Sequence, residues 1–388
     1  MRLLVVTYSS NMNGGANRSL LMVLEYLIKL YQYDIHVIVP GRGALSDALD
    51  KAGISWESHH FNSIGMINMS TLKGVGRYFK HKINVNRNRM EARRQFAKLK
   101  NANFELVYLN NNGAVYGANL ATYLGLPFIW HFRGEINDKA HYLPEVALML
   151  DRCNRIIAIS HDMKALYLKN PVLARKRIDV IHNSIALTNC EPSSQTRDTG
   201  FHIVQCGRIA AEKCQLDAIK AVDILVKHQK DIYLHIVGTS YGGDGKAYEH
   251  TIREYVNEHD LKDNVIFEGY RDDMSDFRRH MNCELICSLR EPFGRVTLEG
   301  MRSGLTIIGA NTGGTMEIIQ DGQTGLIYKQ GDTEDLAHKI LAVYSNPKIG
   351  NTLARNGMEY ANTHFLPENT VSSLNELFNE VMSREHAK

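Results

Sequence analysis

The sequence predicts an α/β protein with two parallel-sheet domains, and three observations support this. The chain has 388 residues, which suits two domains of about 150–200 residues better than one. Short β-rich runs alternate with helix-like runs, a pattern typical of parallel sheets with helices on both faces. The alternation pauses at 183–200, whose Ser, Thr, Asn and Pro content is that of a linker.

The elements of the first half follow in order. The β-rich run RLLVVTYS leads through the glycine pair Gly14–Gly15 into the helical pattern ANRSLLMVLEYLIKL. Further strands are expected in DIHVIVPG, ELVYL, PFIWHF, RIIAIS and RIDVIHN, and further helices in GALSDALDKAG and GAVYGANLATYLG. No small-residue cleavage site follows the first run, so we interpret it as a strand and not as a signal peptide.

The second half repeats the pattern. Strands are expected in FHIVQCG, IYLHIVG, NVIFEG, CELICS and LTIIGA, with helices between them. The final run, PENTVSSLNELFNEVMSREHAK, reads as a helix. We therefore expect one domain over 1–188, a second over 189–365 and a C-terminal helix over 366–388.

Composition narrows the class of protein. Apolar residues make up 44% and charged residues 22%, which is typical of soluble globular proteins. No run approaches the ~18 apolar residues of a transmembrane helix. The six cysteines show no CxxC spacing, so neither a zinc site nor a redox pair is expected, and a reduced cytoplasmic compartment is the simplest interpretation.

One segment is strongly basic although the net charge is only +3. Residues 71–100 contain ten Lys or Arg and one acid, Glu91, with apolar and aromatic residues between them. A solvated helix face is one interpretation, and contact with anionic lipid head groups or an anionic acceptor is another. Nucleic acid is a third, but no recognisable nucleic-acid module accompanies the charge, so we expect no nucleic-acid partner.

Charged residues follow two predicted strands of the second half, where ligands of parallel sheets bind. Arg208 and Lys213 lie in a turn that leads into a helix, a favourable place for an anion, unless both simply pair with surface acids. Glu291 and Glu299 lie on either side of Gly294, before and within the next helix. A wholly helical segment would separate them by ~12 Å, about the reach of a nucleotide sugar, whereas an exposed helix glutamate is the alternative for Glu299.

The runs GRIAAEK, EPFGRVTLEGMRSG, GANTGGTMEIIQDGQTGLIY and DVIHNSI resemble those of family 4 retaining glycosyltransferases. The E-x7-E signature of this family is met by Glu291 and Glu299. The resemblance implies the GT-B fold, in which two Rossmann-like domains face a central cleft. The first domain would bind the acceptor and the second the donor, and the last helix would cross back to the first domain.

The resemblance also implies an activity. A hexosyltransferase of this type moves a sugar from a UDP- or GDP-sugar to a glycan or lipid-linked acceptor and retains the anomeric configuration. We expect a role in bacterial surface polysaccharide biosynthesis, in the cytoplasm or peripherally on the inner face of the membrane. Segment 71–100 is the candidate for contact with an anionic membrane surface.

Individual roles in the second domain follow from the resemblance. Arg208 and Lys213 would neutralise the donor diphosphate, Glu291 would orient the transferred sugar, and Glu299 would bind the ribose hydroxyls. Backbone N–H groups would add to the phosphate site around Phe293, Gly294, Arg295 and Val296.

In the first domain, Gly14 and Gly15 would approach the donor phosphates or the acceptor, and His131 would lie near the donor sugar. A satisfied strand-end histidine is the alternative for His131. The expected catalytic set is therefore His131, Glu291, Arg208 and Lys213. No Asp-x-Asp pair is present, so neither a metal nor another cofactor is implied.

The chain also departs from the family pattern. Arg295 replaces an aliphatic residue and Gly300 replaces an alanine, which leaves the donor open. Two other classes remain possible on this architecture, a sugar-nucleotide epimerase and a non-catalytic sugar-nucleotide-binding subunit. The sequence offers no carboxylate as a nucleophile, so a same-face route assisted by the leaving phosphate is favoured.

Overall fold

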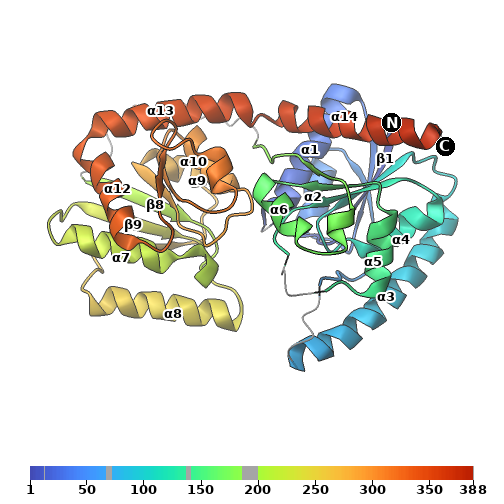
Figure 1. Cartoon of the computed structure of the whole chain (residues 1–388), viewed down its shortest axis with the longest axis horizontal. Coiled ribbons are helices and arrows are strands. Elements are labelled where there is room, and N and C mark those ends of the chain that lie inside the picture. Colours follow the sequence, from blue (N-terminus) through green and yellow to red (C-terminus); the bar gives the residue numbers. More distant parts are fainter. Residues whose placement is uncertain (13, 67–71, 137–140, 186–199, 388) are drawn as a thin grey trace. The chain divides into compact units, whose positions relative to one another are not determined.

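The computed structural model describes residues 1–12, 14–66, 72–136, 141–185 and 200–387 (Figure 1). Most of the linker expected over 183–200 therefore lies outside the described residues. The chain divides into two compact units. Unit 1 comprises Met1–Ser184 and Pro367–Lys388, and unit 2 comprises Ile185–Leu366. Within the described ranges, no helix combines the length and apolar character needed to cross a bilayer.

Unit 1 is built on a sheet of seven parallel strands in the order β3-β2-β1-β4-β5-β6-β7. The strands are β1 (Arg2–Thr7), β2 (Asp34–Val39), β3 (Ser55–Ser58), β4 (Leu106–Asn110), β5 (Phe128–Phe132), β6 (Arg155–Ala158) and β7 (Ile178–Val180). Because strands β1, β4 and β5 are buried along their whole or nearly whole length, they read in the sequence as continuous apolar runs.

Helices cover the sheet of unit 1. They are α1 (Gly15–Tyr31), α2 (Ala44–Lys51), α3 (Leu72–Leu99), α4 (Val115–Leu124), α5 (Pro144–Arg152), α6 (His161–Leu168) and α14 (Pro367–His386), with a short 3₁₀ turn, η1 (Leu173–Arg175). Helices α1, α2 and α14 share one apolar core with the strands. The C-terminal helix α14 contributes Leu374 and Phe378 to this core, and its Glu380 pairs with Arg155 of β6 at 3.0 Å.

Unit 2 contains six parallel strands in the order β10-β9-β8-β11-β12-β13. The strands are β8 (Phe201–Cys206), β9 (Ile232–Val237), β10 (Val265–Gly269), β11 (Cys283–Ile286), β12 (Thr306–Ala310) and β13 (Leu326–Tyr328). The helices and 3₁₀ turn are η2 (Ala211–Lys213), α7 (Gln215–Val226), α8 (Gly242–Glu258), α9 (Met274–Arg279), α10 (Arg295–Arg302), α11 (Thr315–Ile318), α12 (Thr333–Ser345) and α13 (Pro347–His364).

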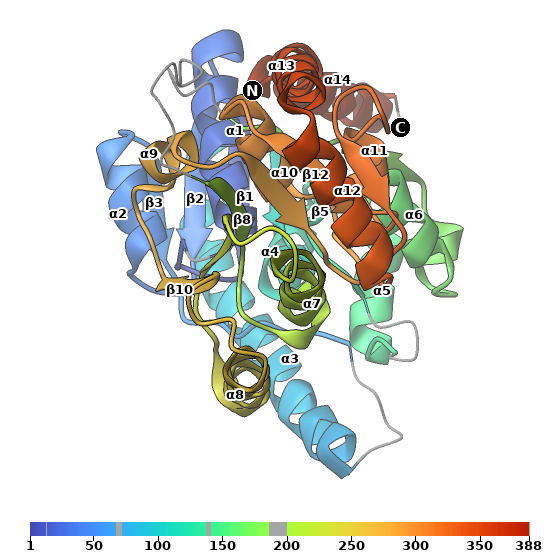
Figure 2. The same cartoon turned by 90° about the vertical axis from the view of Figure 1, so that its left-hand side faces the viewer.

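The helices of unit 2 form two layers around its sheet. Helices α7, α8 and α12 share an apolar core with one sheet face, and α7 lies beside α12 (Figure 2). Helices α10 and α13 pack together on β12. Both sheets have the doubly wound strand order. The chain first adds strands on one side of the first strand and then continues on its other side. The predicted class, α/β with two Rossmann-like parallel-sheet domains, is confirmed.

Candidate functional site

In unit 2 the strand order reverses between β8 and β11. In doubly wound sheets, ligands bind at the carboxyl ends of the strands at this switch point. The segment after β8 carries Arg208 and Lys213, and the segment after β11 carries Glu291. A backbone hydrogen bond joins the two segments, because the Leu289 N–H donates to the Glu212 carbonyl at 2.9 Å. The sequence motifs therefore meet at the ligand edge of the sheet.

Lys213 and Glu291 form the polar centre of this edge. The Lys213 ammonium Nζ lies 2.6 Å from Glu291 Oε2, and the Ser288 hydroxyl donates to the same oxygen at 3.0 Å. The Lys213 carbonyl in turn accepts a hydrogen bond from the Gln205 side chain at 2.9 Å, which fixes the loop. Both charged side chains are partly buried, so each is held in one place while a face remains open to solvent.

Arg208 is held less firmly. Its guanidinium pairs with Glu212, and about half of each side chain is exposed. Exposed pairs of this kind contribute little stability, so exchanging the Glu212 carboxylate for another anion would cost little. The alternative that both cations pair with acids describes the structure as it stands, with Arg208 on Glu212 and Lys213 on Glu291.

Glycines set the backbone around Glu291. Gly294 has φ 93°, and a Cβ there would lie 2.8 Å from Thr297 Oγ1, so only glycine fits without strain. The Gly314 N–H donates to the Glu291 carbonyl at 2.7 Å, and a Cβ on Gly313 would lie 2.5 Å from that oxygen. The NTGGT run therefore packs its backbone directly on the loop that carries Glu291.

The first turn of α10 begins immediately after this loop. Arg295 and Val296 are its first residues, and no side chain caps its N-terminus. Phe293 is buried and packs edge-on against the ring of Phe365, with 5.8 Å between centroids. Because the segment is helical only from Arg295, the 12 Å spacing of a wholly helical segment does not apply to Glu291 and Glu299.

Glu299 contacts a buried ion pair that the sequence motifs do not reveal. Both terminal nitrogens of Arg278, on α9, lie 3.4 Å from Glu299 Oε2. The same guanidinium donates to the two carboxylate oxygens of Glu284, on β11, at 3.0 and 3.1 Å. Glu284 is 0% and Arg278 only 4% exposed. Burial raises the pKa of the Glu284 carboxyl, and the nearby Arg278 charge opposes that shift.

Gly300 makes room for this ion pair. A Cβ at position 300 would lie 2.2 Å from Glu284 Oε2 and 2.7 Å from Ile307 Cδ1. The glycine that replaces the family's alanine is therefore coupled to the buried acid beneath α10. The one sequence signal for the pair was a glutamate inside the otherwise apolar run CELI.

In unit 1 the strand order reverses between β1 and β4. Gly14 and Gly15 open α1 after β1, and a Cβ on Gly14 would meet no atom within 4 Å. His131, on β5, is fully buried, and its Nδ1 lies 2.5 Å from the Tyr108 hydroxyl. Among the described residues its Nε2 has no hydrogen-bond partner. Burial, assisted by the Arg133 charge, holds the pKa of His131 well below its usual range, so the ring is neutral at pH 7.

Arg133 was not predicted and lies beside His131. Its guanidinium is buried and donates to Asn110 Oδ1 at 3.0 Å, to Asn183 Oδ1 at 2.6 Å and to the Tyr108 hydroxyl at 3.2 Å. These side-chain partners within the described part of unit 1 are all uncharged. A cation so held creates a positive potential at this end of the sheet.

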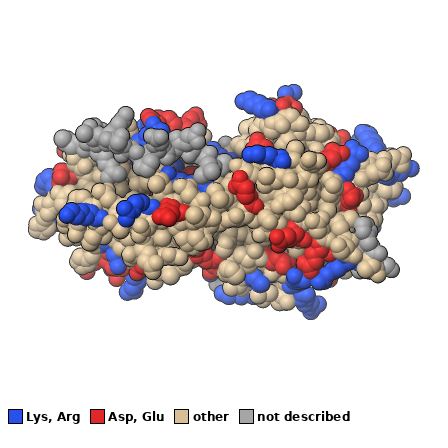
Figure 3. All heavy atoms as spheres, turned by 90° about the horizontal axis from the view of Figure 1, so that it is seen from above, with Lys and Arg blue, Asp and Glu red and all other residues tan. Residues whose placement is uncertain are grey.

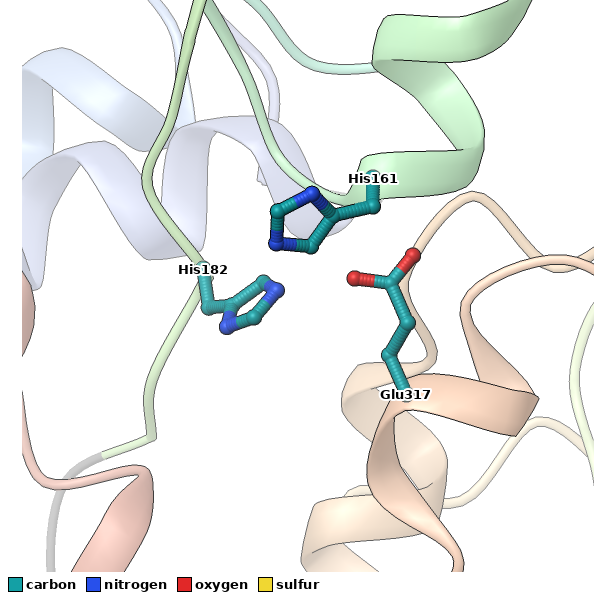
Figure 4. A group of neighbouring side chains, drawn as sticks. All are labelled: His161, His182 and Glu317. Carbon is teal, nitrogen blue, oxygen red and sulfur yellow. The ribbon is translucent and has the colours of Figure 1, made fainter.

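A histidine pair also lies in unit 1. His161 begins α6 and His182 follows β7, and their rings meet edge to face with 5.8 Å between centroids (Figure 4). Glu317, which the figure also draws, belongs to α11 of unit 2. His182 lies in the run DVIHNSI and Glu317 in the run GANTGGTMEIIQDGQTGLIY, but the sequence assigned no role to any of the three.

Comparison with known proteins covers nearly the whole chain. The family model described as "Glycosyl transferases group 1" matches residues 189–360, and the model "Glycosyltransferase Family 4" matches residues 13–189. The structure is similar to that of Anabaena Alr3699/HepE, solved in complex with UDP, with a TM-score of 0.79, 19% identity, and coverage of 98% of this chain and 100% of that chain. At this identity the likeness establishes the fold.

Two of the curated relatives that match in sequence illustrate the similarity. An uncharacterized glycosyltransferase of Methanocaldococcus jannaschii is 32% identical over 164 residues, which cover 42% of this chain and 45% of the relative. The capsular polysaccharide biosynthesis glycosyltransferase CapM of Staphylococcus aureus is 22% identical over 249 residues, 60% of this chain and 63% of the relative. The matched region thus spans less than two thirds of either relative.

Proposed function

Because this chain belongs to the group 1 glycosyltransferases of family 4, we propose that it transfers a sugar from a nucleotide diphosphate sugar to an acceptor hydroxyl with retention of configuration. The observation that carries the proposal is the contact of Lys213 with Glu291 at the switch point of unit 2. An ammonium group and a carboxylate 2.6 Å apart offer neighbouring contacts to a phosphate oxygen and to a sugar hydroxyl.

The chemistry assigned to these groups follows from where charge develops. As the bond between the sugar's anomeric carbon and the phosphate oxygen breaks, negative charge grows on the diphosphate. Lys213 and Arg208 stabilise that charge, and Lys213 is already fixed in position by Glu291 and the Gln205-anchored loop. Glu291 holds the sugar, while Glu299 accepts hydrogen bonds from the ribose.

Retention is assigned to a same-face route. The acceptor oxygen bonds to the anomeric carbon on the side that the phosphate leaves, and the acceptor proton passes to the departing phosphate oxygen. Neutral His131 is assigned to the sugar side of the reaction, where an uncharged imidazole can hydrogen-bond a hydroxyl. This scheme requires no metal ion, since the two cations and the N-terminus of α10 supply the positive potential.

Two similar proteins support a donor and an acceptor class. HepE was solved with UDP, and CapM takes part in capsular polysaccharide synthesis. On this basis the proposed donor is a UDP-sugar, with GDP-sugars next, and the proposed acceptor is a glycan or lipid-linked glycan of a bacterial surface polysaccharide. The proposed location is the cytoplasmic side of the cell membrane.

A donor screen tests this function. The purified chain is incubated with a panel of UDP- and GDP-sugars, with and without a lipid-linked acceptor extract, and nucleotide release is measured. Acceptor-dependent release is expected. Conversion of the sugar nucleotide without release would assign an epimerase instead, and binding without either reaction would assign a non-catalytic subunit.

Site variants connect the activity to the switch point. Lys213→Met is expected to lower turnover about 100-fold or more, because it removes a fixed charge from the leaving group. Lys329→Met removes an exposed lysine of the same unit and serves as the matched control. Equal turnover of both variants would refute the assigned site.

A further inference from the structure

Helix α3 carries an exposed surface that the donor chemistry does not use. The helix packs on α4 at the outside of unit 1 (Figure 1). Its inward side is set by the buried residues Val85, Asn88 and Ala92. Asn88 fastens that side by exchanging two hydrogen bonds with the backbone of Asn62, at 2.9 and 2.7 Å. The orientation of α3 about its own axis is thereby fixed.

Large apolar side chains point the other way. Phe79 is 62%, Ile83 53% and Met90 72% exposed, and Val75 is exposed as well. At about 100° per residue, these four positions fall within roughly 80° of one another, opposite the buried side of the helix. They form an apolar ridge (Val75, Phe79, Ile83 and Met90) that no described part of the chain covers.

Basic side chains border the apolar ridge. Lys80, Arg87 and Arg94 recur every seven residues and form a row along one edge, and Arg89 and Arg93 lie along the other. All five are exposed. The only acid of this segment, Glu91, lies one turn from Arg87 and Arg94, on the side of that row away from the ridge, and its Oε1 accepts a hydrogen bond from the Gln95 side chain at 2.6 Å. Glu145 of α5 pairs with Lys82 at 2.5 Å on the edge that carries Arg89 and Arg93, so the exposed side of α3 combines apolar and cationic groups, with Glu91 and Glu145 at its margins.

We propose that this surface of α3 docks unit 1 on an anionic lipid bilayer, with the apolar ridge entering the head-group boundary and the two basic rows contacting lipid phosphates. Helices that lie in a membrane interface have this arrangement of an apolar strip bordered by Lys and Arg. The face drawn in Figure 3 carries acidic and basic side chains intermixed, an arrangement that would not favour binding to an anionic lipid surface.

The choice of a bilayer over other partners rests on the apolar ridge and the basic rows together. Basic rows alone would suit nucleic acid equally well, but solvent-exposed Phe, Ile and Met between the rows gain nothing from a phosphodiester backbone. A protein partner would have to present a continuous acidic surface around an apolar groove. A bilayer offers both chemistries over its whole area.

Vesicle flotation tests the proposal with the full chain and no donor or acceptor, so its outcome is independent of the glycosyltransferase proposal. The probes are vesicles of phosphatidylcholine alone and of phosphatidylcholine mixed with phosphatidylglycerol. We expect binding to the mixed vesicles, weak binding to the neutral ones, and release as salt is raised.

Two triple variants separate the roles of charge and apolar surface. The row variant (Lys80→Gln, Arg87→Gln, Arg94→Gln) is expected to lower the partition coefficient about 100-fold. The ridge variant (Phe79→Gln, Ile83→Gln, Met90→Gln) is expected to lower it by more than about tenfold. The matched control removes three exposed lysines from unit 2 (Lys246→Gln, Lys262→Gln, Lys348→Gln). Helicity and thermal unfolding confirm that each variant is folded.

Several outcomes would overturn the proposal. Equal binding of the row variant and the control variant would do so, as would equal binding to neutral and mixed vesicles. Duplex DNA binding at the same salt without vesicle binding would assign the surface to nucleic acid. Self-association that the ridge variant abolishes, again without vesicle binding, would assign it to a second copy of the chain.

Discussion

The Arg278 guanidinium connects a fully buried acid, Glu284, to a partly exposed one, Glu299. Its planar fork reaches both carboxylates at once, which a lysine cannot do from the same position. Glu284 therefore anchors Arg278, and Arg278 fixes the carboxylate assigned to the ribose. Because Arg278 touches no substrate in this scheme, we regard it as a positioning residue.

Arg278→Lys tests that role. If Glu299 binds the ribose, the variant should lose about tenfold in affinity for the donor nucleotide. It should also lose its discrimination between a nucleoside diphosphate and the 2′-deoxy form, measured by calorimetry. Arg279→Lys, a more exposed neighbour on α9, is the matched control. A purely structural Arg278 would change thermal stability and leave the ribose discrimination intact.

The neutral state of His131 leads to a second prediction at the scale of a residue, which concerns the pH dependence of stability. Its pKa is depressed in the folded protein, so between the ordinary value of 6.5 and the lower folded value the unfolded chain binds a proton that the folded chain does not. The stability of unit 1 is therefore full above pH 6.5 and falls as the pH drops, by up to about 1.4 kcal/mol per pH unit from this group.

Denaturant unfolding at pH 7, 6 and 5 measures this slope. Both tryptophans, Trp56 and Trp130, belong to unit 1, so their fluorescence reports its unfolding. His131→Asn should flatten the pH dependence by about one proton, whereas His228→Asn, an exposed histidine of unit 2, should not. An unchanged slope in His131→Asn would contradict the buried neutral imidazole.

At the scale of elements, α10 lies against β11 because position 300 lacks a side chain. Gly300→Ala should destabilise unit 2 by about 1–3 kcal/mol, since the new methyl group would overlap the Glu284 carboxylate and Ile307. Gly243→Ala is the matched control, because a Cβ there meets nothing within 4 Å in α8. Thermal unfolding measures both variants. Equal melting temperatures would mean that α10 can shift away from the strand at no cost.

Most strands that the sequence predicted are largely buried, although the edge strands β7 and β10, with one buried residue each, were predicted as well. Strands such as β1, β8 and β12 read as continuous apolar runs and were predicted. Strand β3 (Ser55–Ser58), at a sheet edge with no buried residue, was not, and neither was the three-residue β13. Their residues carry no pattern of their own, and only pairing with a neighbouring strand makes them extended.

The residues of the candidate site also fall into two groups, those that the sequence predicted and those that it did not. Lys213 and Glu291 follow strands in recognisable motifs, and they are in contact in the structure. Arg208 and Glu299 belong to the same motifs, and their place in the site stays a prediction. Arg278, Glu284 and Arg133 come from α9, β11 and the segment after β5, and tertiary packing alone gives them their partners. Local patterns cannot reveal such pairs, because each residue's neighbours in space are distant in the sequence.

At the scale of the whole molecule, each unit has its own sheet, core and switch point. The groups assigned to the donor nucleotide, Arg208, Lys213, Glu291 and Glu299, all belong to unit 2. The C-terminal helix α14, by contrast, completes the core of unit 1, where Leu374 and Phe378 are buried. Unit 2 can therefore be separated at Leu366 without exposing that core.

A fragment spanning 185–366 should consequently fold and bind the nucleoside diphosphate within about tenfold of the full chain, a difference of about 1.4 kcal/mol. It should release no nucleotide in the presence of acceptor, because His131 and the remaining groups of unit 1 are missing. Calorimetry and the release assay measure the two properties on one preparation, with Lys213→Met in the fragment as the control for the site. A fragment that is folded by circular dichroism yet binds no nucleotide would show that donor affinity depends on residues of unit 1, and the assignment of the donor to the switch point of unit 2 would then fail.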